Sequence, residues 1–216
     1  AVLPQSDIDG SLEEIDYALN TLKAPAFCMG TSVGITYLGD KTLEPILAEL
    51  DRRRAVVYTH PNEADWAHDL VPGVSAAAVW YGNDTTVAIW SLLSSGAPKK
   101  YPNIRWIMSH AGGTLPYMVQ RVVGEPVAPK LNGTPVPGDR LYYLRNNFFY
   151  DTAQAANAAA MPALKVVVGM SQILFGTDYP WSTIDVDVEG MIDCGAFSPD
   201  ELTTIYRDNA LRLLPL

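Results

Sequence analysis

Three residues able to bind a metal or move a proton stand at the ends of short apolar runs. His60 follows AVVYT, His110 follows IRWIMS and Asp178 follows ILFGT. A neutral imidazole suits a divalent metal, and a carboxylate that leaves a buried strand needs a cation or strong donors. The chain has only three histidines, so two at such ends indicate a metal or acid–base centre. Read alone, each histidine also fits a residue that is merely hydrogen-bonded.

The elements that must position these residues alternate along the chain. Short continuous apolar runs over 26–30, 55–59, 104–109, 148–150 and 173–176 predict five strands buried on both faces. Val2 and Leu3 have the composition of the end of a further strand. Helical stretches fill the intervals, and this alternation predicts an α/β fold with a parallel sheet.

Several residues carry helix start and stop signals. Ser11 with Glu14, and Ser198 with Glu201, have the spacing of capping boxes. Asp40 is predicted to cap a helix, and Gly96 is predicted to end a helix over 84–95. The proline- and glycine-rich stretch 124–139 predicts a surface loop.

The polar residues at three strand ends favour a closed barrel over an open sheet, because barrel enzymes draw catalytic groups from the carboxyl ends of several strands. We therefore predict a (β/α)8 TIM barrel. The sequence supplies about the last five to six βα units, so two to three units, roughly 60–100 residues at about 30 each, are missing. Residues 1–216 are expected to be the C-terminal portion of one barrel domain, completed by something else.

The composition of the chain argues against two classes of binding partner. A net charge of −9 and a pI near 4.7 argue against nucleic acid or an anionic membrane surface. No apolar run approaches the ~18 residues that span a bilayer. Cys28 and Cys194 lack metal-ligand spacing and indicate a reduced, cytoplasmic protein.

Taken together, the segments resemble a known family. In order, ELDRRRAVVYTHP, SHAGGTLP, FFYDTA, ILFGTDYPW and IYRDNALRLL are similar to the amidohydrolase-related, metal-dependent decarboxylases. That group includes the aminocarboxymuconate-semialdehyde, γ-resorcylate and 6-methylsalicylate decarboxylases, and the likeness covers nearly the whole chain. It implies non-oxidative decarboxylation of a small aromatic acid such as an ortho-hydroxybenzoate, with the 6-methylsalicylate type nearest.

The resemblance also implies roles for individual residues. His60 and Asp178 correspond to metal ligands, and His110 corresponds to the catalytic histidine that activates water or shuttles a proton. Asp178 is also expected to take part in catalysis as a proton donor. The cofactor implied is a divalent metal, with zinc as the first expectation and manganese as the second.

Two further positions match residues that contact the substrate. Arg121 matches an arginine that in some members reaches the site of a neighbouring subunit and holds the substrate carboxylate, which implies a homodimer. Trp181 matches an aromatic wall of the substrate pocket. The alternatives are an exposed helix arginine and ordinary packing at the barrel rim.

One departure from the family leaves other functions open. Family members begin with a strand that ends in His-x-His or Glu-x-His and completes the metal site, and this sequence has no such pair. His68, the remaining histidine, lies in the polar segment ADWAHDL, where we expect a surface residue rather than a replacement ligand. The alternatives are a metal-dependent hydrolase of a lactone or amide and a truncated, inactive paralogue.

Overall fold

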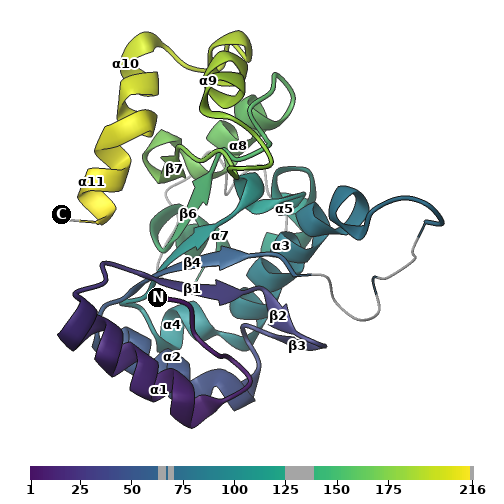
Figure 1. Ribbon diagram of the computed structural model, residues 1–216. Helices are drawn as coiled ribbons and strands as arrows, with labels where there is room; N and C mark the ends of the chain where they lie inside the picture. Colours follow the sequence, from purple (N-terminus) through teal and green to yellow (C-terminus); the bar gives the residue numbers. More distant parts are fainter. Residues whose placement is uncertain (63–66, 68–70, 125–138, 215–216) are drawn as a thin grey trace. The chain divides into compact units, whose positions relative to one another are not determined.

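The computed structural model describes residues 1–62, 67, 71–124 and 139–214. Contacts divide the chain into two compact units, Ala1–Ile107 (unit 1) and Met108–Leu216 (unit 2). Each unit combines parallel strands with helices, so each is α/β (Figure 1). Whether the 216 residues form part of a single barrel domain stays a prediction.

Unit 1 is organised around parallel strands. β1 (Phe27–Gly30) pairs with β4 (Val56–His60), which places Gly30 opposite His60. β5 (Arg105–Met108) follows β4 in the strand order, and the Arg105 N–H donates to the Ala55 carbonyl at 3.0 Å. Val2 makes an isolated parallel bridge with Cys28, as the predicted strand end requires.

A short hairpin, not predicted, extends from β1. Its strands β2 (Ser32–Val33) and β3 (Thr36–Tyr37) are antiparallel. Two residues per strand are too few to show a period in the sequence.

The helices of unit 1 bury their apolar sides against these strands. They are α1 (Ile8–Tyr17), α2 (Glu44–Arg52), α3 (Ala76–Ser95) and α4 (Ala97–Lys100), with the single turns η1 (Ala18–Leu22) and η2 (Lys41–Leu43). In Figure 1, α1 and α2 lie side by side on the same side of β1 and β4. The fully buried core includes Ile15, Phe27, Met29, Ile46, Leu50, Val57, Ile89 and Leu92.

One predicted cap in unit 1 is wrong and two signals are confirmed. α1 begins before the Ser11–Glu14 pair, because the Asp7 carboxylate accepts the N–H of Gly10 at 3.0 Å and starts the helix there. Ser11 is instead buried, and its hydroxyl donates to the Pro4 carbonyl at 2.9 Å. Asp40 caps η2 by accepting the N–H of Thr42 at 2.8 Å. Gly96, with φ 76°, ends α3, although that helix begins at Ala76 rather than at residue 84.

Unit 2 contains the parallel pair β6 (Phe148–Asp151) and β7 (Ile173–Leu174), with Asp151 opposite Leu174. All four residues of β6 are buried, as its continuous apolar sequence predicts. The five predicted strands of the chain are thus confirmed. The accompanying elements are η4 (His110–Gly112), α5 (Leu115–Val123), α7 (Arg140–Asn146), α8 (Ala160–Val168), η5 (Met170–Gln172), α9 (Ile184–Asp193), α10 (Pro199–Thr203), η6 (Thr204–Asp208) and α11 (Asn209–Leu213).

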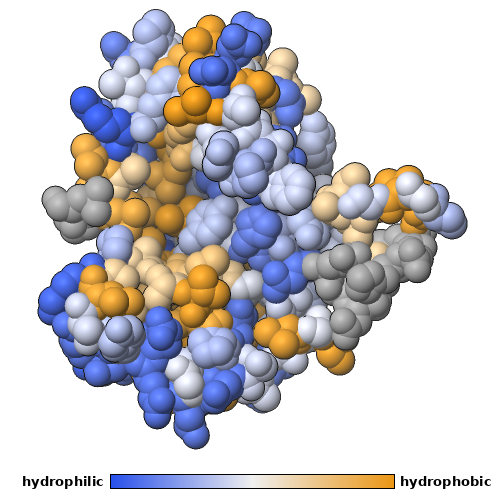
Figure 2. Space-filling view, in the orientation of Figure 1, coloured by the Kyte–Doolittle hydropathy of each residue, from blue (hydrophilic) through white to orange (hydrophobic). Residues whose placement is uncertain are grey.

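The C-terminal helices of unit 2 show both a confirmed signal and an exposed apolar surface. The Ser198–Glu201 capping box is present at the start of α10. Apolar side chains lie on the outside of α9, where Ile184, Val186 and Ile192 are more than half exposed (Figure 2). Residues 125–138 of the predicted loop lie outside the described residues. Within the described part of the chain, no helix combines the length and apolarity needed to cross a membrane.

Candidate functional site

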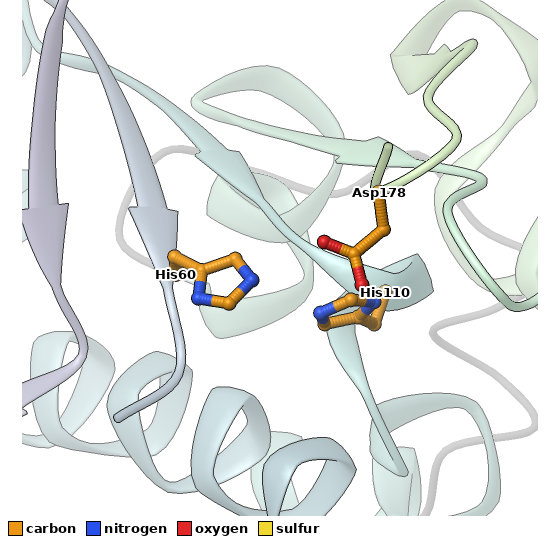
Figure 3. Close-up of side chains that lie close together, drawn as sticks. All are labelled: His60, His110 and Asp178. Atoms are coloured by element: carbon orange, nitrogen blue, oxygen red, sulfur yellow. The ribbon is translucent and has the colours of Figure 1, made fainter. Parts of the chain in front are cut away.

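Unit 2 brings His110 and Asp178 together. His110 follows β5 after one residue, and Asp178 lies four residues beyond β7. The carboxylate of Asp178 points at the imidazole of His110 (Figure 3), and ligand atoms of the two side chains lie within 4.8 Å of each other. Oδ2 of Asp178 also accepts a hydrogen bond from Nε2 of Gln154 at 2.5 Å. An imidazole beside a carboxylate can bind a cation or transfer a proton.

The backbone around this pair is held in a conformation that side chains disfavour. His110, Ala111, Gln154 and Asp178 have φ values of 53°, 58°, 52° and 61°. Residues other than glycine rarely adopt this left-handed region, and such strain persists only where the surroundings enforce it. Four strained residues after three strand ends mark this rim of unit 2 as a candidate active site.

A buried carboxylate supplies part of that enforcement. Asp151, the last residue of β6, is 5% exposed. Its Oδ1 accepts the backbone N–H of His110 at 2.8 Å and that of Ala153 at 3.1 Å. Asp151 therefore ties the segment that carries His110 to the segment that leads to Gln154.

The ends of β6 and β7 approach each other closely at Gly176. A Cβ on Gly176 would lie 3.0 Å from the Cβ of Asp151, tighter than ordinary packing allows. The Thr152 hydroxyl donates to the carbonyl of Gly176 and accepts its N–H, both at 3.2 Å. A side chain at position 176 would therefore require Asp151 to shift, just before the chain reaches Asp178.

The hydrogen bond at Nδ1 of His110 decides what its other ring nitrogen can do. Nδ1 lies 3.1 Å from the carbonyl oxygen of Ala153. A carbonyl can only accept, so Nδ1 carries the proton in the neutral ring and Nε2 keeps a lone pair. Metal-binding histidines commonly have their second nitrogen tied in this way. Nε2 of His110 is therefore suited to bind a cation or accept a proton.

His60, in unit 1, has the same arrangement. It is the last residue of β4, and its Nδ1 lies 3.0 Å from the carbonyl oxygen of Pro61. The same argument leaves the lone pair on Nε2. The ring of Tyr81, on α3, meets the His60 ring edge-on, with centroids 6.1 Å apart. Both histidines thus present the nitrogen that a metal needs.

The two residues expected to contact substrate lie on exposed surfaces of unit 2. Arg121 is exposed in the last turn of α5. The Trp181 side chain is 82% exposed, and its backbone N–H donates to the carbonyl of Asp178 at 2.8 Å. Trp181 therefore belongs to the turn that follows Asp178. Exposure fits a contact with substrate or with a second subunit, and it also fits a simple surface residue.

Asp151 and Gln154 were not predicted as site residues. Asp151 carries the same signal as Asp178, a carboxylate at the end of a buried strand (FFYD), and could have been found by it. Gln154 has no such signal, because its approach to Asp178 follows from the turn after β6.

The contribution of the Asp151–His110 hydrogen bond to stability and activity can be measured. We expect Asp151→Ala to lower the free energy of unfolding by about 2–6 kcal/mol, because two N–H donors lose their acceptor at about 1–3 kcal/mol each. Activity should fall as well, since His110 loses a support for its strained backbone. Urea unfolding and turnover of the same samples provide the two readouts.

A matched control lies in the same unit. Asp139 caps α7 by accepting the N–H of Leu141 at 2.9 Å. Asp139→Ala should cost about 1 kcal/mol, as for other helix caps, with turnover unchanged. Equal loss of turnover in both variants would show that Asp151 acts only through overall stability.

The profile of the amidohydrolase family matches residues 1–216. The 6-methylsalicylic acid decarboxylase acuB of Aspergillus aculeatus is 34% identical over 213 residues, which cover 95% of this chain. The chain spans 64% of the length of that relative.

Solved structures show the same fold. The chain is covered completely by a 2,6-dihydroxybenzoate decarboxylase in complex with 2,6-dihydroxybenzoate, with a TM-score of 0.83, 23% identity and 70% of that chain matched. A second match is a dihydroxybenzoic acid decarboxylase of Polaromonas sp. JS666, solved with manganese and the inhibitor 2-nitroresorcinol. Its TM-score is 0.79 at 22% identity, and the match covers 100% of this chain and 68% of that chain. These matches confirm the predicted α/β barrel fold class.

Proposed function

The chain belongs to the amidohydrolase family, and from that premise we propose that its protein is a metal-dependent decarboxylase of small aromatic carboxylic acids. Its relatives include a 6-methylsalicylic acid decarboxylase, a 2-amino-3-carboxymuconate-6-semialdehyde decarboxylase and a gamma-resorcylate decarboxylase. The resemblance inferred from the sequence is thereby confirmed at the level of the family. The substrate class proposed is an ortho-hydroxybenzoate, with 6-methylsalicylate first.

The proposed metal ligands are His60 and Asp178, as the family resemblance implies, with His110 beside Asp178 as a third donor. Two imidazoles and one carboxylate are a donor set used by catalytic zinc and by other divalent metals. The observation that carries the proposal is the state of both rings, whose Nδ1 atoms face backbone carbonyls, so that Nε2 carries the lone pair in each neutral ring. We propose His110 both as a ligand and as the base or proton carrier, and variants at His110 and Asp178 separate these roles.

The native metal is proposed to be zinc, with manganese as the alternative that the manganese-bound structural relative supports. A bound divalent metal acts as a Lewis acid and orients an oxygen-rich substrate. Comparing turnover of metal-free protein reloaded with each ion identifies the one that supports catalysis.

The residues of this chain then supply the proton that decarboxylation requires. Decarboxylation breaks the bond between the ring carbon and the carboxylate, releases carbon dioxide and needs one proton on that ring carbon. Asp178 is proposed as the proton donor, with His110 beside it to relay a proton from solvent. Gln154 holds Oδ2 of Asp178 and so orients the carboxylate for this step.

The test uses the complete gene product with zinc or manganese and three acids. With 6-methylsalicylate we expect carbon dioxide and 3-methylphenol, and in deuterated water one deuterium on the carbon that carried the carboxylate. 2,6-Dihydroxybenzoate tests tolerance of a second hydroxyl, and 2-methylbenzoate lacks the ortho hydroxyl and should not react. Hydrolysis of a lactone or amide without carbon dioxide release would favour the hydrolase alternative, and absence of metal binding would favour the inactive paralogue.

We further propose that the protein is a cytoplasmic homodimer. Cys28 and Cys194 are both free thiols, in keeping with a reducing compartment. The exposed apolar side chains of α9 and the exposed Arg121 are surface that a second copy could cover.

In a dimer, Arg121 is expected to bind the substrate carboxylate in the site of the partner subunit. Light scattering should give twice the mass of one chain, and Arg121→Ala should raise KM by about 10–100-fold with little change in kcat, because a charged hydrogen bond to a carboxylate is worth about 1.5–3 kcal/mol. Arg212→Ala, another exposed arginine of unit 2, is the control and should leave KM unchanged. A strictly monomeric protein would remove the proposed role of Arg121.

A further inference from the structure

Unit 1 contains a fully buried carboxylate that the proposed chemistry does not use. Asp84, within α3, has no exposed surface. Its Oδ1 accepts a hydrogen bond from the hydroxyl of Tyr37 at 2.6 Å, and its Oδ2 accepts from the hydroxyl of Thr31 and from the backbone N–H of Asn62 at 3.2 Å. Three neutral donors converge on it, which is what a buried carboxylate needs in order to be tolerated.

The hydroxyl of Tyr37 is well suited to remain a donor. Burial, the hydrogen bond to Asp84 and the charge of that carboxylate, in this order, raise the pKa of Tyr37 well above its ordinary value. The phenol therefore keeps its proton throughout the neutral range, and Asp84 keeps this partner.

The backbone bond to Asn62 links Asp84 to His60 through one rigid group. The N–H of Asn62 and the carbonyl of Pro61 belong to the same planar peptide, in which they point in opposite directions. The N–H faces Oδ2 of Asp84, and the carbonyl faces Nδ1 of His60 at 3.0 Å. Holding the N–H side of this peptide therefore orients the oxygen that sets the protonated nitrogen of His60.

The rest of the cluster keeps that peptide in place. The Thr31 N–H donates to the His60 carbonyl at 2.9 Å, and the Thr31 hydroxyl oxygen also accepts the Asn62 N–H at 3.2 Å. The Asn62 side chain donates to the carbonyl of Ser32 at 2.8 Å. A Cβ on Gly30 would lie 2.1 Å from this Asn62 amide, so a larger residue there would displace the amide from its position.

We propose that Asp84 is a positioning residue for His60: by holding the Pro61–Asn62 peptide, it keeps the proton on Nδ1 and the lone pair on Nε2 of His60. The part of this proposal that concerns metal affinity rests on the proposed function. The part that concerns the ring of His60 does not, because it describes the metal-free protein.

The first measurement is made on the unmodified chain. With only three histidines in the sequence, nitrogen-15 spectra of the imidazoles at alkaline pH, where the rings are neutral, report which nitrogen of each carries the proton. A His60→Gln variant assigns the signals. We expect a proton on Nδ1 of His60 in metal-free protein. Finding it on Nε2 would overturn the proposal without any change at Asp84.

The second measurement compares variants at Asp84. Asp84→Ala removes the acceptor, and we expect a mixture of tautomers at His60 and a loss of zinc or manganese affinity of about 10–100-fold, the usual effect of removing such a support. Asp84→Asn keeps an oxygen that can accept from Thr31 and Asn62 while its amide donates to Tyr37, so it should restore both readouts. Zinc affinity is measured by competition with a coloured chelator, and manganese by electron paramagnetic resonance.

The control removes a comparable carboxylate at the opposite ends of the strands. Asp51, on α2, accepts the backbone N–H of Asn103 at 2.8 Å, two residues before β5. Asp51→Ala should reduce stability and leave the His60 tautomer and the metal affinity unchanged. An Asp84→Ala protein that keeps the wild-type tautomer would overturn the proposal. If the wild type shows the expected tautomer and binds neither metal, the metal-dependent function fails while the positioning role is supported.

Discussion

Replacement of Asp178 by asparagine is expected to lower the decarboxylation rate by about 10²- to 10⁴-fold, the range for loss of a positioned proton donor. Asparagine has the shape of aspartate, but it has neither the charge that a cation needs nor a proton of suitable acidity. The backbone at this residue should be retained, because asparagine tolerates the φ of 61° found there. Initial rates of carbon dioxide release from 6-methylsalicylate provide the measurement.

A control for Asp178→Asn is available seven residues later. Asp185 is an exposed aspartate in the first turn of α9. Asp185→Asn carries the same change of charge in the same segment and should keep the rate within a factor of about 2, as for an exposed charge. Equal losses in the two variants would contradict a direct role for Asp178.

The roles of Asp178 can be separated by its effect on the metal. If Asp178 only donates a proton, Asp178→Asn should bind metal as the wild type does. If it is also a ligand, affinity should fall together with the rate. His110→Gln gives the parallel comparison for the histidine beside it, and a loss of rate without loss of metal would assign His110 to proton transfer alone.

The second large effect is expected at His60. His60→Ala removes one imidazole from a proposed set of three ligands, so we expect metal content after dialysis to fall to a small fraction of the wild-type value and activity to fall with it. Metal analysis of the purified protein and turnover with added zinc or manganese provide the two readouts. Recovery of activity at high metal concentration would show weakened binding rather than a lost fold.

The remaining histidine supplies the matched control. His68 lies outside the described residues, in the segment that we expect to be at the surface from its sequence. His68→Ala should leave both metal content and turnover unchanged. A loss of metal in His68→Ala that equals the loss in His60→Ala would show that the ligand set has been assigned wrongly.

Much of the fold follows from local patterns in the sequence. Each of the five strands is a continuous apolar run, because a parallel strand buried on both faces admits few polar side chains. Helix ends were less certain. The box at Ser11 and Glu14 has the right spacing, yet Asp7 begins α1 one turn earlier by capping Gly10. Two residues with capping potential compete here; Asp7 caps the helix, and the Ser11 hydroxyl donates to the Pro4 carbonyl instead.

His60, His110 and Asp178 each follow a strand, and strand ends can be read from the composition of the sequence alone. Only the tertiary structure reveals the groups that orient two of them, His110 and His60. Asp151 and Ala153 fix the backbone and the ring of His110 from residues more than forty positions away. Asp84 reaches the turn after His60 from the middle of a helix. The sequence therefore determines which side chains follow the strands, because a buried strand appears in it as a continuous apolar run. The protonated nitrogen of each ring depends on single hydrogen bonds between distant segments, and such bonds leave no pattern in the order of residues.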